Sequence, residues 1–389
     1  MASNVAASPL QAAQAIAPLA AAQAADAEHA RQLTGDVAAA IREAGLFRLA
    51  VPATLGGGEA APADLIEAVE ALAAGDGAAG WCVAVCATAG MLAAYLEPAA
   101  AREVYGGPES VAGGVFAPKG RAVATPGGTF TVDGRWPFAS NVAHCDWLMG
   151  GCMVLDGDTP RRLASGRPDV RLVLFPAADA EVIDTWSVSG LRATGSHDIE
   201  VRGLGVPAGR SASLITDAPR EPGPLYAFPP FGLLAASIAA AALGIARGAI
   251  DETAALAAAR TPALGTRTLA ERPGAQAEIA RAEAEVRAAR ALLHESTGAA
   301  WAAAQSGGAI PPDLRAGLRL AATHATEAAA GAVDRCWRLA GGSALYESGA
   351  LQRRFRDVHA ATQHMLVAPG TWELAGRVRL GVDTDLSQL

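Results

Sequence analysis

The pattern of apolar and polar positions divides the chain into three zones. Residues 1 to about 110 are rich in Ala, Leu, Gln and Glu, which favour helices, and their apolar side chains recur at helical spacing. Residues from about 111 to 220 contain more Gly, Pro, Val and Thr, with a turn signal roughly every ten residues. From about residue 225 onward the helical spacing returns. We therefore expect helices, then strands, then helices again.

The middle and last zones predict particular elements. Gly-rich turns bracket a strand at residues 129–132. Further strands are expected at residues 147–155, 170–175 and 199–206. Their spacing is typical of a small antiparallel barrel or sandwich. An apolar helix opens at Asp76 and runs to about Leu96. The last zone predicts four helices, at residues 231–259, 275–304, 314–339 and 355–380. Long helices with short connections indicate a bundle.

These elements predict an α+β protein with three domains. We expect an N-terminal helical domain over residues 1–110, a central small antiparallel β-barrel or sandwich over residues 111–222, and a C-terminal four-helix bundle over residues 223–389.

Composition excludes several classes of protein. Hydrophobic residues make up 51% of the 389 positions and charged residues 18%, which is typical of a globular chain. The net charge of -8 argues against nucleic-acid binding, which usually needs a basic face. No Lys or Arg precedes Arg31, so we expect no secretory signal. The apolar run at residues 231–245 is too short to span a bilayer, so we expect no membrane association.

The cysteines and histidines predict no metal site. Five cysteines occur, an odd number, and no pair has the spacing of a zinc ribbon. Cys82 and Cys86 are four residues apart, which favours two small core residues on one helical face over a redox pair. The histidines lack acidic partners at ligand spacing. Reduced thiols are typical of a cytoplasmic protein.

Three motifs carry a family resemblance. They are residues 134–141 (GRWPFASN), residues 186–198 (WSVSGLRATGSHD), and residues 341–346 (GGSALY) with residues 354–357 (RFRD). These resemble the flavin-contacting segments of the acyl-CoA dehydrogenase superfamily. The resemblance implies the acyl-CoA dehydrogenase-like fold and a homotetramer in which the C-terminal bundle completes the neighbour's flavin site.

Two further segments resemble one branch of that superfamily. Residues 359–364 (HAATQH) and the pair Gly80-Trp81 are similar to the oxygenase component of two-component flavin-dependent monooxygenases. That group includes p-hydroxyphenylacetate hydroxylase, secosteroid phenol hydroxylase and dibenzothiophene monooxygenase. A dehydrogenase needs a carboxylate base beside the flavin. In the dehydrogenases of the family this base occurs at one of two positions, which correspond to residues 358–365 and 231–250 here. Neither segment contains an Asp or Glu.

The resemblance implies two catalytic residues. Ser140 would face flavin N5 and donate a hydroxyl that steadies a C4a-hydroperoxyflavin, which also requires that water be excluded. His364 would handle a proton, since the pKa of an imidazole lies near neutral pH. An ordinary turn serine and a core histidine are the alternatives. Trp81 and His359 would line the substrate side, with ordinary packing as the alternative for both.

The resemblance also implies a set of cofactor-binding residues. The members are Trp136, Phe138, Ser140, Asn141 and Trp186 near the isoalloxazine ring, Arg260 or Arg267 at the phosphate, and Gly341 and Gly342 against the cofactor. The alternatives are core aromatics, a solvated loop arginine and a helix C-cap. His144 and His197 are expected to be structural or to lie near the ribityl chain.

These observations favour a flavin-dependent monooxygenase. It would take reduced FMN or FAD from a separate flavin reductase and hydroxylate an aromatic or polyketide-like small molecule. One alternative is an acyl-CoA dehydrogenase with a displaced base such as Glu373. A second is a non-catalytic member whose flavin pocket has become an interaction surface.

Overall fold

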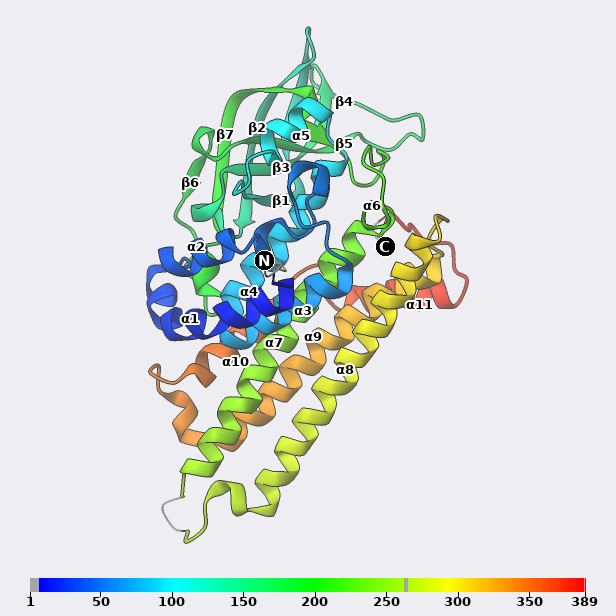
Figure 1. The fold of residues 1–389 in the computed structure, drawn as a ribbon. Helices are drawn as coiled ribbons and strands as arrows, with labels where there is room; N and C mark the ends of the chain where they lie inside the picture. Colours follow the sequence, from blue (N-terminus) through cyan, green and yellow to red (C-terminus); the bar gives the residue numbers. More distant parts are fainter. Residues whose placement is uncertain (1–6, 262–264, 388) are drawn as a thin grey trace, which may run out of the picture.

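A computed structural model of the protein describes residues 7–261, 265–387 and 389, with a sheet at one end and three long helices at the other (Figure 1). The N-terminal helices are α1 (Pro9–Ala30), α2 (Gly35–Glu43), α3 (Pro62–Gly75), α4 (Gly77–Ala89) and α5 (Pro98–Tyr105). Helix α1 begins at Ser8, whose hydroxyl accepts the Gln11 N–H in a capping box. Helix α4 begins at Asp76, whose carboxylate accepts the Ala79 N–H at 3.1 Å.

The strands form one mixed sheet. They are β1 (Ala112–Thr125), β2 (Thr129–Ala139), β3 (Trp147–Asp156), β4 (Thr159–Pro160), β5 (Val170–Pro176), β6 (Glu181–Ile183), β7 (His197–Pro207) and β8 (Ser211–Ala212). The order is β6-β7-β2-β1-β3-β5-β8, with β4 paired to β3. The prediction of a purely antiparallel sheet was wrong, because β1 and β3 pair in parallel. The chain turns into β2 on one side of β1 and then crosses to the other side, so β3 runs in the direction of β1.

Trp136 is the centre of the sheet's packing. Its side chain is fully buried and its indole N–H donates to the Gly151 carbonyl at 2.7 Å. A Cβ at Gly120, Gly134 or Gly150 would lie 2.2–2.5 Å from the indole ring. The indole therefore fills space that these strands leave open only because they carry glycine at those positions.

The C-terminal helices agree with the pattern except at the fourth. They are α6 (Pro224–Ala227), α7 (Pro230–Ala259), α8 (Pro273–Gln305), α9 (Pro312–Ala340), α10 (Ala350–Ala361) and α11 (Gly370–Arg379). The single helix predicted at residues 355–380 was wrong, since the structure has α10 and α11 with a turn between them. Pro369 lacks an N–H and restricts Ala368, which favours a break at this point. In sequence order the helices up to Tyr105 precede the strands, and α6 begins at Pro224. The division into three separate domains stays a prediction.

Two helical segments are long and apolar enough to cross a membrane by length and composition alone. They are Gly77–Ala94 and Pro230–Ala259, and 94% of each tested window is buried inside the protein. The run at residues 231–245, judged too short to span a bilayer, lies within the 30-residue helix α7. Burial is the stronger evidence for core helices, since α7 packs so closely on α3 that a Cβ at Gly244 would lie 2.3 Å from the Glu70 carbonyl oxygen.

We expect Gly150→Ala to lower the free energy of unfolding by about 1–3 kcal/mol, because the new Cβ would lie 2.4 Å from the Trp136 ring. Chemical denaturation monitored by tryptophan fluorescence measures the change. Gly205→Ala in β7 is the matched control, since its Cβ would meet no atom within 4 Å. Equal stabilities of the two variants would contradict this account of the sheet core.

Candidate active site

Three residues that the sequence singled out come together from three separate segments. The Trp81 indole N–H on α4 donates to Ser140 Oγ, just after β2, at 3.3 Å. The Trp81 ring also meets the imidazole of His364 edge to face, with ring centroids 5.7 Å apart. Trp81 therefore joins the hydroxyl and the imidazole in one place.

Ser140 is the first member of a buried chain of hydroxyl groups. Ser140 Oγ lies 2.7 Å from Ser196 Oγ, which lies 2.6 Å from Thr194 Oγ1. Thr194 Oγ1 donates to the Leu191 carbonyl at 2.8 Å. Each hydroxyl has one proton, so Thr194 must accept from Ser196, and Ser196 must accept from Ser140. In this network the Ser140 proton is used inside the protein and its oxygen offers a lone pair; the role of Ser140 at the cofactor stays a prediction.

The imidazole of His364 is neutral at neutral pH. Burial, and then the positive charge of Arg319, lower its pKa to about 4. Arg319 is a buried residue of α9, with only 4% of its surface exposed. The expectation that the pKa of His364 lies near neutral is therefore wrong in this environment.

Phe138 and Trp186 form an aromatic pair close in sequence to the hydroxyl chain. Their ring centroids are 6.0 Å apart in an edge-to-face arrangement, and Phe138 is 66% exposed with φ of 70°. The Trp186 indole N–H donates to the Leu191 carbonyl at 3.1 Å, the same oxygen that Thr194 uses. An exposed aromatic face therefore borders the hydroxyl chain.

Trp136 and Asn141, two residues predicted to bind the cofactor, have a packing role in the structure. Trp136 is in the core of the sheet, so it follows the alternative of a plain core aromatic and does not present a face to a ligand. Asn141 is also buried; its backbone N–H donates to the Thr194 carbonyl at 2.7 Å and its amide Nδ2 to Cys86 Sγ at 3.4 Å. Asn141 therefore holds the segment after Ser140 against α4.

His359 belongs to a different group of side chains. Its Nε2 lies 3.0 Å from the Asp334 carboxylate, and its ring meets Phe355 with centroids 4.6 Å apart. His359 is therefore engaged at the α9–α10 contact, and its place at the edge of the substrate site stays a prediction.

The residues expected at the cofactor phosphate lie near the end of α9. Arg260 donates to the Ala340 carbonyl at 2.6 Å, which satisfies a carbonyl in the last turn of that helix. Gly341 has φ of 57°, and side-chain space beside Gly341 and Gly342 is open. Arg267 is exposed. The structure brings Arg260 close to Gly341 and Gly342. Within one chain, these three residues are not brought together with Trp81.

His144 and His197, the two histidines of the strand-rich zone, have structural partners. His144 Nε2 lies 3.1 Å from the Leu33 carbonyl, and His197 Nδ1 accepts the Trp186 N–H at 3.3 Å. Within the described parts of the chain no group of three or more His, Cys, Asp or Glu could hold a metal ion.

A tight junction connects α10 to the loop that ends the hydroxyl chain. The Asp357 carboxylate accepts the Leu191 N–H at 2.6 Å. A Cβ at Gly190 would lie 2.1 Å from the Arg356 carbonyl oxygen, so the two backbones are in contact. Burial, and then the nearby Asp76, raise the pKa of Asp357 to about 7. This carboxylate is occupied by the backbone and is not a free base.

Ser196, Thr194 and Arg319 are parts of the site that the sequence did not identify. Ser196 and Thr194 lie inside the 186–198 motif, so their position in a recognisable segment was the available signal. Arg319 resembles the other arginines on the polar faces of long helices. Only its burial distinguishes it.

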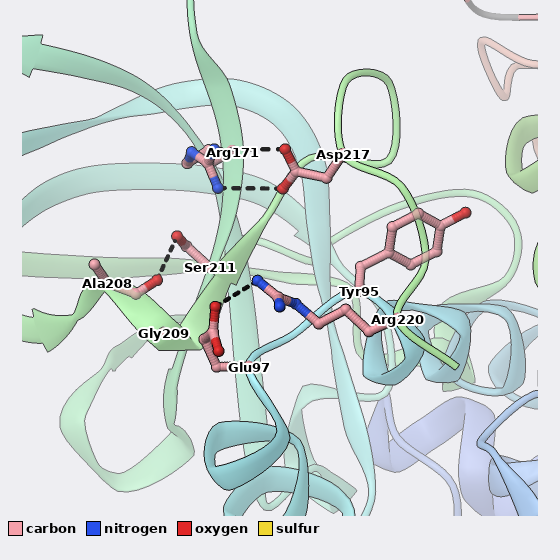
Figure 2. A pocket seen from close by; sticks show the side chains of 8 residues that line it. All are labelled: Tyr95, Glu97, Arg171, Ala208, Gly209, Ser211, Asp217 and Arg220. Carbon is pink, nitrogen blue, oxygen red and sulfur yellow. Dashed lines mark hydrogen bonds and ion pairs between the residues drawn. The ribbon is translucent and has the colours of Figure 1, made fainter. Parts of the chain in front are cut away.

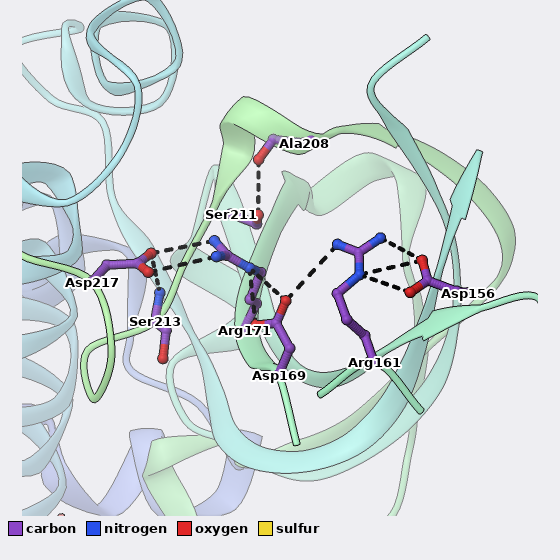
Figure 3. A network of polar contacts seen from close by, with 8 residues as sticks. All are labelled: Asp156, Arg161, Asp169, Arg171, Ala208, Ser211, Ser213 and Asp217. Carbon is purple, nitrogen blue, oxygen red and sulfur yellow. Dashed lines mark hydrogen bonds and ion pairs between the residues drawn. The ribbon is translucent and has the colours of Figure 1, made fainter. Parts of the chain in front are cut away.

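A cavity of about 340 Å³ lies elsewhere, between the region after α4 and the sheet (Figure 2). Its charged side chains are paired: Arg220 with Glu97, and Arg171 with Asp217 at 3.2 Å. Figure 3 shows that Arg171 also contacts Asp169, within a network that continues along the sheet. We assign this network to structural support, because each of its charged side chains is paired with one of opposite charge.

Comparisons with known proteins give the class. A model of the family described as acyl-CoA dehydrogenase, C-terminal domain, matches residues 236–369. The chain is 33% identical to the indole-3-acetate monooxygenase of Pseudomonas putida, over 90% of this chain and 88% of that protein. It is 30% identical to the flavin-dependent monooxygenase oxygenase subunit HsaA of Rhodococcus jostii, over 87% and 89%. The structure of XiaF from Streptomyces sp. in complex with FADH2 and glycerol matches with a TM-score of 0.87 and 26% identity, over 96% and 95%.

The chain therefore belongs to the flavin-dependent monooxygenases that have the acyl-CoA dehydrogenase-like fold. Within them it is similar to oxygenase subunits, so it is an oxidoreductase and the non-catalytic alternative is wrong. The displaced-base alternative also loses its candidate, since Glu373 is exposed on α11.

We expect His364 to make the protein less stable in acid. Its pKa is 6.5 when unfolded and about 4 when folded, so between these values the unfolded state binds the proton and the folded state does not. Stability should fall as the pH falls from about 6.5 to about 4. Denaturant melts across that range should show a smaller loss for His364→Gln than for the unchanged protein. Parallel curves for the two proteins would contradict the lowered pKa.

Proposed function

We propose that this enzyme hydroxylates an aromatic or polyketide-like small molecule beside Trp81, Ser140 and His364. Its reducing cofactor would be FMN or FAD in the reduced state, delivered by a separate flavin reductase. The observation that carries the proposal is the convergence of a hydroxyl and a neutral imidazole on one buried indole. The similarity to an indole-3-acetate monooxygenase supports the aromatic substrate, and the similarity to a structure in complex with FADH2 supports the reduced flavin.

The residues present fit a flavin. Phe138 and Trp186 offer an aromatic face for an isoalloxazine ring, and the Ser140 oxygen offers an acceptor for the N–H that reduced flavin carries at N5. Arg260 or Arg267, with Gly341 and Gly342, would hold the phosphate of a flavin in a neighbouring subunit. When bound, reduced flavin supplies two electrons and activates dioxygen.

The protein's own groups would shape the reaction around that cofactor. The indole of Trp81 covers the Ser140 hydroxyl, and Trp81 is itself buried, with an exposed fraction of 7%. This covering keeps water from the Ser140 oxygen, which protects a reactive oxygen species from wasteful decay. His364, held against the other edge of Trp81, would contact the substrate.

We expect Ser140→Ala to divert oxygen from product to hydrogen peroxide. Loss of the acceptor that Ser140 offers to N5 should lower hydroxylation roughly 10- to 100-fold relative to peroxide release, the effect of one buried hydrogen bond. The measurement is product formed and peroxide released per reduced flavin, with indole-3-acetate as the first substrate tried. Ser306→Ala, on an exposed turn, is the control. An unchanged ratio in Ser140→Ala would remove Ser140 from the proposal.

We further propose a homotetramer in the cytoplasm. Five large apolar side chains are unusually exposed, with exposed fractions between 63% and 80%: Phe138, Leu345, Tyr346, Met365 and Leu380. Leu345 and Tyr346 follow Gly341 and Gly342, the glycines expected at a neighbour's cofactor, which supports an interface there. All five cysteines are buried and unpaired, as suits a reducing compartment.

Light scattering should give a particle of four 39.2 kDa chains. Replacing both Leu345 and Tyr346 with Asp places charge in the proposed interface and should yield smaller species that bind reduced flavin more weakly. Replacing the exposed Leu380 with Asp is the matched control. A monomeric unchanged protein would contradict the tetramer.

A further inference from the structure

The imidazole of His364 is fixed by a backbone amide. The N–H of Leu366 donates to His364 Nδ1 at 3.3 Å. A backbone amide can only donate, so Nδ1 must be the unprotonated nitrogen. A neutral imidazole has one ring proton, and here that proton must be on Nε2.

The Leu366 peptide that orients His364 is itself held on both sides. Its carbonyl accepts Arg319 Nε from α9 at 3.2 Å and Thr371 Oγ1 from α11 at 3.4 Å. The His364 carbonyl accepts the Val367 N–H at 3.0 Å. The turn between α10 and α11 therefore cannot rotate the imidazole without breaking bonds to two helices.

The surroundings favour the neutral ring over the cation. Trp81 from α4 covers one edge, and the charged group facing the imidazole is Arg319. Burial and that positive charge together hold the pKa of His364 at about 4. Both effects act in the same direction, so the ring is neutral through the whole range above about pH 5.

We propose that His364 presents a fixed N–H donor at Nε2, and that this donor orients the substrate by binding one of its acceptor atoms. This inference rests on the proposed function, since it concerns the same site. The lone pair that a general base would use is already occupied by Leu366. His364 therefore orients an acceptor atom of the substrate. Arg319 is a positioning residue, which holds the donor in place.

Two substitutions of His364 distinguish a role as hydrogen-bond donor from a role as general base. In His364→Gln the longer amide can place an N–H where Nε2 stands, whereas in His364→Asn the shorter side chain reaches only the place of Nδ1. Neither amide can take up a proton. A fixed donor predicts that Gln retains most hydroxylation and that Asn loses roughly 10- to 100-fold, the effect of one buried hydrogen bond. Equal and severe losses in both variants would overturn the donor role and favour a base. His29→Gln, exposed on α1, is the control.

A second measurement does not depend on catalysis. Long-range proton–nitrogen NMR of protein labelled at histidine nitrogens reports which ring nitrogen carries the proton, and the His364 signals are those lost in His364→Gln. We expect the Nε2-protonated form alone from about pH 5 to 8, and a mixture of both neutral forms in Arg319→Met. A proton on Nδ1, or a cation at neutral pH, would overturn the inference. If the unchanged enzyme hydroxylates none of the aromatic substrates while NMR shows the fixed donor, the proposed function fails and the orientation of His364 stands.

Discussion

The bond between the Asp357 carboxylate and the Leu191 N–H is the constraint on which the site depends. Leu191 has φ of 52°, and its carbonyl accepts both Thr194 Oγ1 and the Trp186 indole. One residue therefore joins the hydroxyl chain, the aromatic pair and α10. Asp357 is fully enclosed, and leaving its amide partner unsatisfied would cost about 1–3 kcal/mol. Together with the backbone contact between Gly190 and Arg356, this bond fixes where α10 and the turn after it lie relative to Ser140.

Backbone groups set the polarity at both ends of the site. The Leu191 carbonyl can only accept, so the hydroxyl chain runs toward it and leaves a lone pair on Ser140. The Leu366 N–H can only donate, so the proton of His364 is on its far nitrogen. Because peptide groups do not titrate, the donor and acceptor pattern is the same across the working pH range. Side chains provide the reactive atoms, and the main chain determines their direction.

Different parts of the structure were predictable from the sequence to different degrees. The helices α7, α8 and α9 followed from long Ala-rich patterns, and Trp81, Ser140 and His364 followed from motifs that resemble a known family. Strand β1 was not expected, since its glycines and Pro118 interrupt the alternation that indicates a strand. Its irregular pairing with β3 comes from the same residues. The break between α10 and α11 and the burial of Arg319 depend on contacts between distant segments, which a local pattern does not contain.

The close approach of α4 to its neighbours has a consequence for how new activities arise in this scaffold. A Cβ at Gly80 would lie 2.4 Å from Ala73, and one at Gly77 would lie 2.8 Å from Ile245. The helix that carries Trp81 has no spare room, so substitutions along it would be purged before they could broaden the range of accepted molecules. Exposed positions near the site, such as Met365, tolerate change at little cost to folding. Sequence changes, in nature or in directed evolution, should therefore accumulate at the exposed positions around the site and leave α4 unaltered.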